Sequence, residues 1–309
     1  MLGKRIPIFI SWSLTHRCPY QCLYCSSWKR KGPELNADQI CHIIDDLAKC
    51  GTSYISFTGG EPFLKESLIG IVRNAVENKI IININSSGFG VKENQEVLTL
   101  IDSLTLSLDG PEEIHNSIRG DSKAFEKVIE AARLGKKVGV KVKLFAVINK
   151  NNIDSIDNLL QIAEDLNCPV GFQPATFYKL RGEEVNPIDL SNQETYQVLE
   201  SLIIKKKDGA RISNSITGLR ALQSQIYHKP PQCWAGKVSF RIDPDGTLHV
   251  CPRAKDHHVR IYVVDGIKQG IDKLERQYPC SQCCCTARTE LNCILSGKIG
   301  PAMNQFWSK

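Results

Sequence analysis

The sequence has no long apolar run, no internal repeat and no large block of like charge. No segment reaches the roughly 20 apolar residues of a membrane-spanning helix, so a membrane partner is not expected. The 39 Lys and Arg residues are scattered, with Lys205-Lys206-Lys207 as the one basic run, so a nucleic-acid partner is not expected either. Lys4 and Arg5 precede a short apolar run that contains Pro7 and lacks a small-residue cleavage site, which favours a cytoplasmic protein.

The most informative feature that the sequence does contain is a set of 13 cysteines. Cys18, Cys22 and Cys25 form a C-x3-C-x2-C motif directly after the apolar run 8–14, which predicts a loop at the carboxyl end of a strand. Thiols this close together in a chain of 309 residues favour a soft metal centre over disulfides. Because a four-iron cluster normally takes four thiolates, three ligands would leave one iron open. A structural zinc site and a chance spacing are the alternatives, although zinc ligands usually come as two pairs.

Short apolar runs and helical patterns alternate through the first half of the chain. The expected strands cover 8–14, 53–58, 80–85, 103–108, 140–147 and 170–173, and the expected helices cover 36–51, 64–78, 93–100, 125–137 and 153–166. Strict alternation predicts an α/β fold with an all-parallel sheet and right-handed crossovers. Functional loops then lie at the carboxyl ends of the strands, where the cysteine motif, the Gly59-Gly60-Glu61-Pro62 turn, Ser87 and Asp109 all fall.

These motifs carry a resemblance to a known family. The cysteine motif, with Tyr24 just before its last cysteine, resembles the signature of the radical S-adenosylmethionine (SAM) superfamily. Four further segments resemble that family in the expected order, namely Gly59-Gly60-Glu61-Pro62, Asn85-Ser86-Ser87-Gly88, Ser107-Leu108-Asp109-Gly110-Pro111 and the stretch from His115 to Arg119-Gly120. The resemblance covers about the first half of the chain. It implies an enzyme built on a partial (β/α)6 TIM barrel.

The resemblance also implies the cofactors and the reaction. A [4Fe-4S] cluster held by Cys18, Cys22 and Cys25 would bind SAM at its open iron. One-electron reduction would cleave SAM to methionine and a 5′-deoxyadenosyl radical, which abstracts a hydrogen atom from the substrate. The cofactors carry that chemistry, so no catalytic side chain is expected beyond the cluster ligands. A flavodoxin- or ferredoxin-type protein is the expected electron donor.

Residues in the same motifs are candidates for SAM contacts. They are Tyr24, Gly59, Gly60, Glu61, Pro62, Ser87, Ser107 and Arg119. The glycine pair would bring the backbone close to the α-amino group, with Glu61 as an anionic acceptor, and Arg119 would pair with the methionine carboxylate. The alternatives are an ordinary strand-to-helix turn for the glycine motif and a surface salt bridge for Arg119. Tyr24 would stack near the adenine or pack the loop, Asp109 fits an Asx turn, and His115 is interpreted as a helix-cap or core residue.

A second set of cysteines lies near the C-terminus. The segment 241–250 predicts a β-hairpin with Asp245-Gly246 at its turn, and this hairpin would bring Cys251 near Cys233. The pattern resembles the SPASM/twitch extension of radical SAM enzymes, which implies one auxiliary [4Fe-4S] cluster, with zinc as the alternative. The predicted ligands are Cys233, Cys251, Cys280 and Cys283, with Cys293 as an alternative. Thr289 stands where the full pattern has a cysteine, so a second auxiliary cluster is not expected, although Cys284 and Cys285 are further candidates for one.

Three domains are expected: a radical SAM partial barrel at 1–190, a helical connector at 191–232 and an auxiliary-cluster domain at 233–309. The first expected strand starts near Ile8, which leaves no room for an N-terminal peptide-recognition domain. We therefore predict a small or medium polar metabolite as substrate, with net oxidation or rearrangement assisted by the auxiliary cluster. A peptide-modifying maturase is the alternative within the enzyme class. A non-catalytic iron–sulfur or zinc electron-transfer protein is the alternative of another class.

Overall fold

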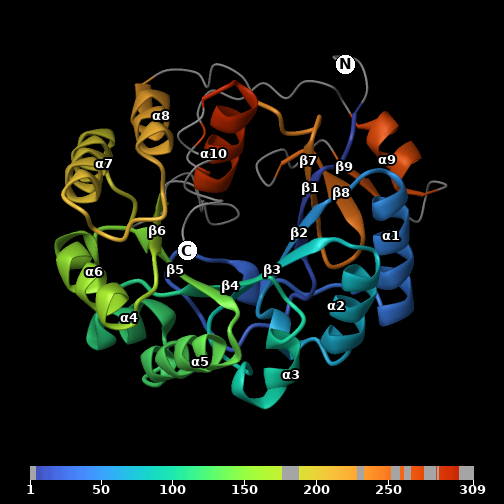
Figure 1. The fold of residues 1–309 in the computed structure, drawn as a ribbon, viewed down its shortest axis with the longest axis horizontal. Helices are drawn as coiled ribbons and strands as arrows, with labels where there is room; N and C mark the ends of the chain where they lie inside the picture. Colours follow the sequence, from blue (N-terminus) through green and yellow to red (C-terminus); the bar gives the residue numbers. More distant parts are fainter. Residues whose placement is uncertain are drawn as a thin grey trace.

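A computed structural model describes residues 5–175, 188–227, 233–251, 258–260, 266–274, 283 and 285–298. Within these ranges one sheet runs in the order β6-β5-β4-β3-β2-β1-β7-β8-β9 (Figure 1). Its strands are β1 (Phe9–Ser13), β2 (Tyr54–Thr58), β3 (Ile81–Ser86), β4 (Ser103–Ser107), β5 (Lys141–Ile148), β6 (Val170–Pro174), β7 (Ser239–Ile242), β8 (Thr247–His249) and β9 (His258–Arg260). The predicted strands of the first half are confirmed.

The pairing of neighbouring strands is parallel from β6 through β1 to β7 and antiparallel from β7 to β9. This agrees with the predicted partial barrel, because each strand of β1 to β6 returns through a helix to the same side. The predicted hairpin forms around the Asp245-Gly246 turn, with the Asp243 N–H donating to the Thr247 carbonyl at 2.9 Å. Its first strand pairs with β1, so the hairpin extends the barrel sheet. The three domain boundaries stay a prediction.

Helices surround the sheet in Figure 1. They are α1 (Ala37–Lys49), α2 (Leu68–Glu77), α3 (Gln95–Leu98), α4 (Glu112–Arg119), α5 (Ala124–Val138), α6 (Ile156–Asp165), α7 (Asn192–Lys207), α8 (Ile216–Tyr227), α9 (Ile267–Lys273) and α10 (Thr286–Leu295). The start of α1 is fixed by a capping box, in which Asn36 accepts from the Gln39 N–H at 2.9 Å and Gln39 accepts from the Asn36 N–H at 3.0 Å. None of the helices in the described ranges is long and apolar enough to cross a membrane.

The two faces of the sheet differ in polarity. One face buries residues such as Trp12, Phe57 and Ile84 in the same core as Ile43 of α1 and Val72 of α2. The other face carries hydroxyl and amide side chains at every second position of neighbouring strands, and these lie in register across β1 to β4. They include Ser11, Ser56, Asn83, Asn85, Ser103 and Thr105.

Hydrogen bonds join the polar side chains into a ladder across the strands. Asn83 donates to the Ser56 hydroxyl at 3.1 Å and accepts from the hydroxyls of Ser103 and Thr105 at 2.8 and 2.9 Å. Asn85 donates to the same Ser56 hydroxyl at 2.7 Å. Since the helices pack on the opposite face, the ladder lines the interior of the open barrel.

Candidate functional site

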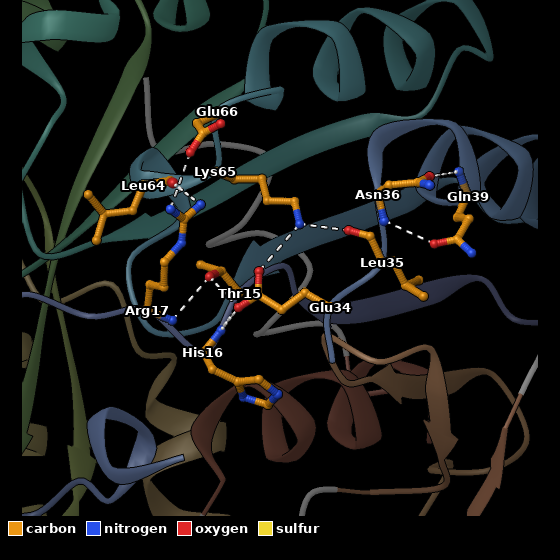
Figure 2. A network of polar contacts seen from close by, with 10 residues as sticks. All are labelled: Thr15, His16, Arg17, Glu34, Leu35, Asn36, Gln39, Leu64, Lys65 and Glu66. Carbon is orange, nitrogen blue, oxygen red and sulfur yellow. Dashed lines mark hydrogen bonds and ion pairs between the residues drawn. The ribbon is translucent and has the colours of Figure 1, made fainter. Parts of the chain in front are cut away.

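A network of polar contacts holds the residues that lead into the cysteine loop (Figure 2). The Glu34 carboxylate accepts hydrogen bonds from the Thr15 hydroxyl and the His16 N–H, both at 2.7 Å. Lys65, which follows the GGEP turn, lies 3.4 Å from the other carboxylate oxygen of Glu34. Burial alone would raise the pKa of Glu34, but the hydrogen bonds from His16 and Thr15 and the charge of Lys65 lower it. The charged carboxylate therefore ties the residues just before Cys18 to the segment after β2.

The two glycines of the GGEP turn allow two backbones to approach closely. The Gly60 N–H donates to the Thr15 carbonyl and the Glu61 N–H donates to the Arg17 carbonyl, each at 2.8 Å. A Cβ atom on Gly60 would lie 2.0 Å from the Arg17 carbonyl oxygen. Gly59 has a φ of +147°, and a Cβ atom there would lie 2.7 Å from the Thr15 carbonyl oxygen. The glycine pair is thus required to dock the turn on the segment that leads to Cys18.

We expect Gly60→Ala to destabilise the fold by at least about 2 kcal/mol, because the clash is with backbone atoms that cannot rotate away. Gly70→Ala is the matched control, since Gly70 lies on the exposed side of α2 and a Cβ atom there meets nothing within 4 Å. That control should gain about 0.5–1 kcal/mol from helix propensity. Urea unfolding of the two variants measures both effects. Equal stabilities would show that the two backbones can move apart at no cost.

Glu61 is fully buried between the ends of β2 and β3. Its carboxylate accepts from the Ser87 N–H at 2.8 Å, the Ser86 hydroxyl at 2.9 Å and the Phe63 N–H at 3.2 Å, and also from the Ser87 hydroxyl. Burial raises the pKa of Glu61, and these hydrogen bonds oppose that rise. Glu61 and Ser87 therefore contact each other. Their predicted contacts with SAM stay a prediction.

Asp109 is the central acceptor at the carboxyl end of β4. One carboxylate oxygen accepts from the Tyr24 hydroxyl at 3.0 Å and lies 2.7 Å from Nη2 of Arg119, and the other accepts from the Val147 N–H at 3.0 Å. The Arg119 guanidinium lies over the Tyr24 ring, 5.6 Å from its centroid, and its Nη1 lies 3.6 Å from the sulfur of Cys22. Burial would lower the pKa of Arg119, but Asp109, Tyr24 and Cys22 raise it well above its usual value.

The geometry around Asp109 bears on two alternatives that the sequence left open, a surface salt bridge for Arg119 and an Asx turn for Asp109. Arg119 is 6 % exposed and Asp109 is 1 % exposed, so their pair is not a surface salt bridge. Asp109 connects the cysteine loop, β4, α4 and β5, which an Asx turn alone does not do. Tyr24 packs within the loop and against Arg119. Whether Arg119 also binds a methionine carboxylate stays a prediction.

The cysteine loop lies across the C-terminal end of α4. The Gln21 N–H donates to the Arg119 carbonyl at 3.2 Å and the Leu23 N–H to the Ile118 carbonyl at 3.0 Å. Besides the contact from Arg119 to Cys22, the sulfur of Cys25 accepts from the Ser27 N–H at 3.4 Å. Hydrogen bonds to sulfur are typical of iron–sulfur ligation.

Burial raises the pKa of Cys18 to about 12 and also raises the pKa of Cys22. Cys18, Cys22 and Cys25 also affect one another electrostatically, which places them in one neighbourhood. Across the described part of the chain, no three His, Cys, Asp or Glu side chains converge as the ligands of a single metal ion do. A four-iron cluster is larger than an ion. Clustered thiols, of which Cys22 is buried and Cys18 and Cys25 are half-buried, fit such a centre, because its iron supplies the positive charge that thiolates need.

Comparison with known families agrees with this geometry. The model of the radical SAM superfamily matches residues 12–163, from β1 into α6. The chain carries a radical SAM domain. For such a domain the family implies a [4Fe-4S] cluster and SAM.

Solved structures show the same fold over more of the chain than the radical SAM domain. SuiB of Streptococcus suis, bound to SAM, has a TM-score of 0.69 at 16% identity over 84% of this chain and 64% of its own. The protein anSMEcpe, solved with bound SAM and the Cp18Cys peptide, has a TM-score of 0.64 at 20% identity over 87% of this chain and 80% of its own. The chain thus spans less than two thirds of the length of SuiB. At these identities the likeness establishes the fold.

Within the radical SAM domain, His115 is a core residue whose neutral form is required. Its Nδ1 accepts from the Asp109 N–H at 3.0 Å, and the side chain is fully buried against Phe125. Burial and the charge of Arg119 hold the pKa of His115 well below 6.5. The interpretation of His115 as a core residue therefore agrees with the structure.

A depressed histidine pKa makes stability depend on pH. Below pH 6.5 the unfolded chain binds a proton at His115 that the folded chain does not. The free energy of unfolding therefore falls by up to about 1.4 kcal/mol for each unit by which the pH is lowered. We expect His115→Asn, which keeps an acceptor for the Asp109 N–H, to flatten this part of the profile. Urea unfolding from pH 7.5 to 5 measures the difference in slope. Parallel profiles would mean that His115 titrates normally.

The described C-terminal cysteines bring two of the predicted ligands together and add a third cysteine to them. Cys283 and Cys251 do lie in one neighbourhood, but they share it with Cys285, which the predicted ligand set left out. Burial, Cys285 and Cys251 raise the pKa of Cys283. Cys233 is exposed, and Cys293 is buried in α10 where Lys298 and Glu290 are the described charged groups that affect it. Cys280 and Cys284 lie outside the described residues.

Sequence reasoning missed several residues that hold the two sites. Glu34 and Arg288 were not singled out, and Asp109 was placed at a functional loop without an assigned contact, although each is a charged group with direct contacts to a cysteine loop or its anchor. Of the other candidates, Pro62 starts a short 3-10 helix at 62–64 and Ser107 ends β4. A carboxylate at the end of a predicted strand was the available signal for Asp109. No local signal pointed to Glu34.

Proposed function

We propose that this radical SAM enzyme holds a [4Fe-4S] cluster with Cys18, Cys22 and Cys25 and acts on a polar substrate, in the first instance a peptide. The observation that carries the proposal is the cysteine loop, whose three thiols share one neighbourhood beside the buried Asp109–Arg119 pair. When bound, the cluster and SAM would supply one-electron reduction of SAM and hydrogen abstraction from the substrate. A flavodoxin- or ferredoxin-type donor and a cytoplasmic location are part of the proposal.

The protein's own residues would orient the cluster and exclude water from it. Asp109 holds the Arg119 guanidinium against Cys22, and Cys22 is 7 % exposed. Such donors and positive charges near the sulfurs stabilise a negatively charged cluster. Gly59, Gly60, Pro62 and Ser107 lie at the same carboxyl ends of β2 and β4 and remain the proposed SAM contacts.

The barrel interior supports a polar substrate. The ladder formed by Ser56, Asn83, Asn85, Ser103 and Thr105 offers donors and acceptors along the inner face of the three neighbouring strands β2, β3 and β4. SuiB has also been solved bound to the precursor peptide SuiA, and anSMEcpe with the Cp18Cys peptide. A peptide is therefore at least as well supported as the polar metabolite that the sequence favoured.

We further propose that the C-terminal cysteines hold an auxiliary [4Fe-4S] cluster. Two of the four predicted ligands, Cys251 and Cys283, lie in one neighbourhood, and a buried guanidinium, that of Arg288, lies among the thiols. Burial alone would lower the pKa of Arg288, but Cys251, Cys285 and Cys283 raise it above its usual value. A buried cation surrounded by thiols fits a centre in which the sulfurs are ionised.

Anaerobic reconstitution tests the proposed function. The full chain is loaded with iron and sulfide, reduced, and assayed for 5′-deoxyadenosine with SAM, first alone and then with pools of synthetic peptides or polar metabolites carrying deuterium. We expect peptides to stimulate the reaction and to transfer deuterium into 5′-deoxyadenosine. Stimulation by metabolites only would overturn the peptide substrate. Iron binding without any SAM cleavage would favour the electron-transfer alternative.

A further inference from the structure

Arg288, in the first turn of α10, is a buried cation without a carboxylate partner among the described residues. It is 7 % exposed, and its Nη1 lies 3.5 Å from the sulfur of Cys285. Its Nε and Nη2 atoms are also buried and make no hydrogen bond in the described part of the chain. Glu290, two residues further along α10, is directed elsewhere, because its carboxylate accepts from the Ser215 N–H at 2.8 Å and from the Ser215 hydroxyl at 2.7 Å and forms no ion pair with Arg288 among the described residues.

A guanidinium in this position needs a nearby negative charge. Arginine does not lose its proton in proteins, and an unpaired charge away from water is strongly unfavourable. The titratable groups that affect Arg288 are Cys251, Cys285 and Cys283. Neutral thiols are weak acceptors, whereas an iron–sulfur centre ligated by cysteines carries the negative charge that such a guanidinium needs.

The position of Cys285 also suits a ligand of an anionic centre. Cys285 is the residue that immediately precedes α10, a helix of 10 residues, so its sulfur lies at the positive end of the helix dipole. The Cys285 N–H also donates to the sulfur of Cys283. The helix end and the guanidinium of Arg288 therefore act on the sulfur of Cys285, and the backbone donor acts on the sulfur of Cys283.

We infer that Cys285 is a ligand of the auxiliary cluster, together with Cys251 and Cys283, and that Arg288 is the positioning residue that balances the charge of this centre. The inference rests on the auxiliary cluster of the proposed function and specifies its ligands. It departs from the C-x2-C spacing, which assigned Cys280 and Cys283 and left Cys285 out. Because reduction adds negative charge to the cluster, a buried cation beside it should raise the reduction potential.

The test uses the full chain with Cys18, Cys22 and Cys25 replaced by alanine, so that only the second site can hold iron. We expect this parent to bind about four iron atoms per chain after anaerobic reconstitution. Cys285→Ala should reduce the iron content several-fold, and Cys283→Ala should reduce it to the same extent. Cys168→Ala is the control, because Cys168 is a buried thiol in the barrel core, and it should leave the iron content unchanged.

Arg288 is tested by the potential of the cluster. Arg288→Lys keeps the charge and Arg288→Gln removes it, so we expect the midpoint potential from electron paramagnetic resonance titration to fall clearly in the Gln variant and only slightly in the Lys variant. Full iron in Cys285→Ala with an unchanged potential in Arg288→Gln would overturn the inference. Zinc in place of iron would overturn it too. A parent without iron, when the wild-type chain still cleaves SAM, would overturn this inference and the auxiliary cluster, while leaving the proposed cleavage of SAM at the first cluster intact.

Discussion

Replacing Cys22 by alanine is expected to remove the first cluster and with it the cleavage of SAM. Cys22 is the most buried of the three motif cysteines, and its sulfur lies 3.6 Å from Nη1 of Arg119. A cluster that already lacks a fourth thiolate cannot keep its place with only two. Since the cofactors carry the chemistry, we expect 5′-deoxyadenosine formation to fall by at least about a thousandfold. Iron content should fall by about four atoms per chain, the content of one cluster.

The control for this prediction is another cysteine of the same chain. Cys41 lies on α1, is partly exposed and belongs to neither cysteine set, so Cys41→Ala should keep both the iron and the activity. Circular dichroism and iron analysis of the two variants separate cluster loss from misfolding. SAM cleavage by a folded Cys22→Ala variant at the wild-type rate would refute the proposed ligand set.

The strands of the barrel could be predicted because each one is a short apolar run between polar turns. The parallel order follows from the helices between the strands, since a crossover returns the chain to the same end of the sheet. Helix α4 was missed for a physical reason. Its sequence Glu112–Arg119 has only two aliphatic residues, and it buries His115 and Arg119, whose burial is stabilised by Asp109. Periodicity cannot identify a buried face made of polar groups.

The polar barrel interior had a sequence signal that was not used. Parallel strands are usually apolar on both faces, yet β2, β3 and β4 alternate Ile, Phe or Leu with Ser, Asn or Thr. In a sheet covered by helices on one side, this alternation indicates a polar inner face. The contacts of Glu34 with His16 and of Asp109 with Tyr24 had no such signal, because they join residues 18 and 85 positions apart.

Both proposed clusters share one physical arrangement. Arg119 lies beside Cys22 and Arg288 beside Cys285, and each guanidinium is buried. They differ in their other partner, because Arg119 pairs with Asp109 and the described residues offer Arg288 no carboxylate. The first cation is balanced before any cluster binds, whereas the second depends on ionised sulfurs. The first site should therefore stay folded when the cluster is absent, and Asp109 should be the residue on which that depends.

Replacing Asp109 by asparagine is accordingly expected to cost about 3–5 kcal/mol of unfolding free energy in the cluster-free chain, since it leaves the Arg119 charge buried and unpaired. Asp109→Leu combined with Arg119→Met should recover at least about 1–3 kcal/mol relative to the sum of the single changes, because no buried charge remains. Asp157→Asn is the matched control, since Asp157 pairs with Lys205 at the surface and should cost no more than about 1 kcal/mol. Anaerobic urea unfolding measures these variants together with the single changes Asp109→Leu and Arg119→Met. Equal costs for Asp109→Asn and Asp157→Asn would show that the charge on Arg119 is balanced by another group.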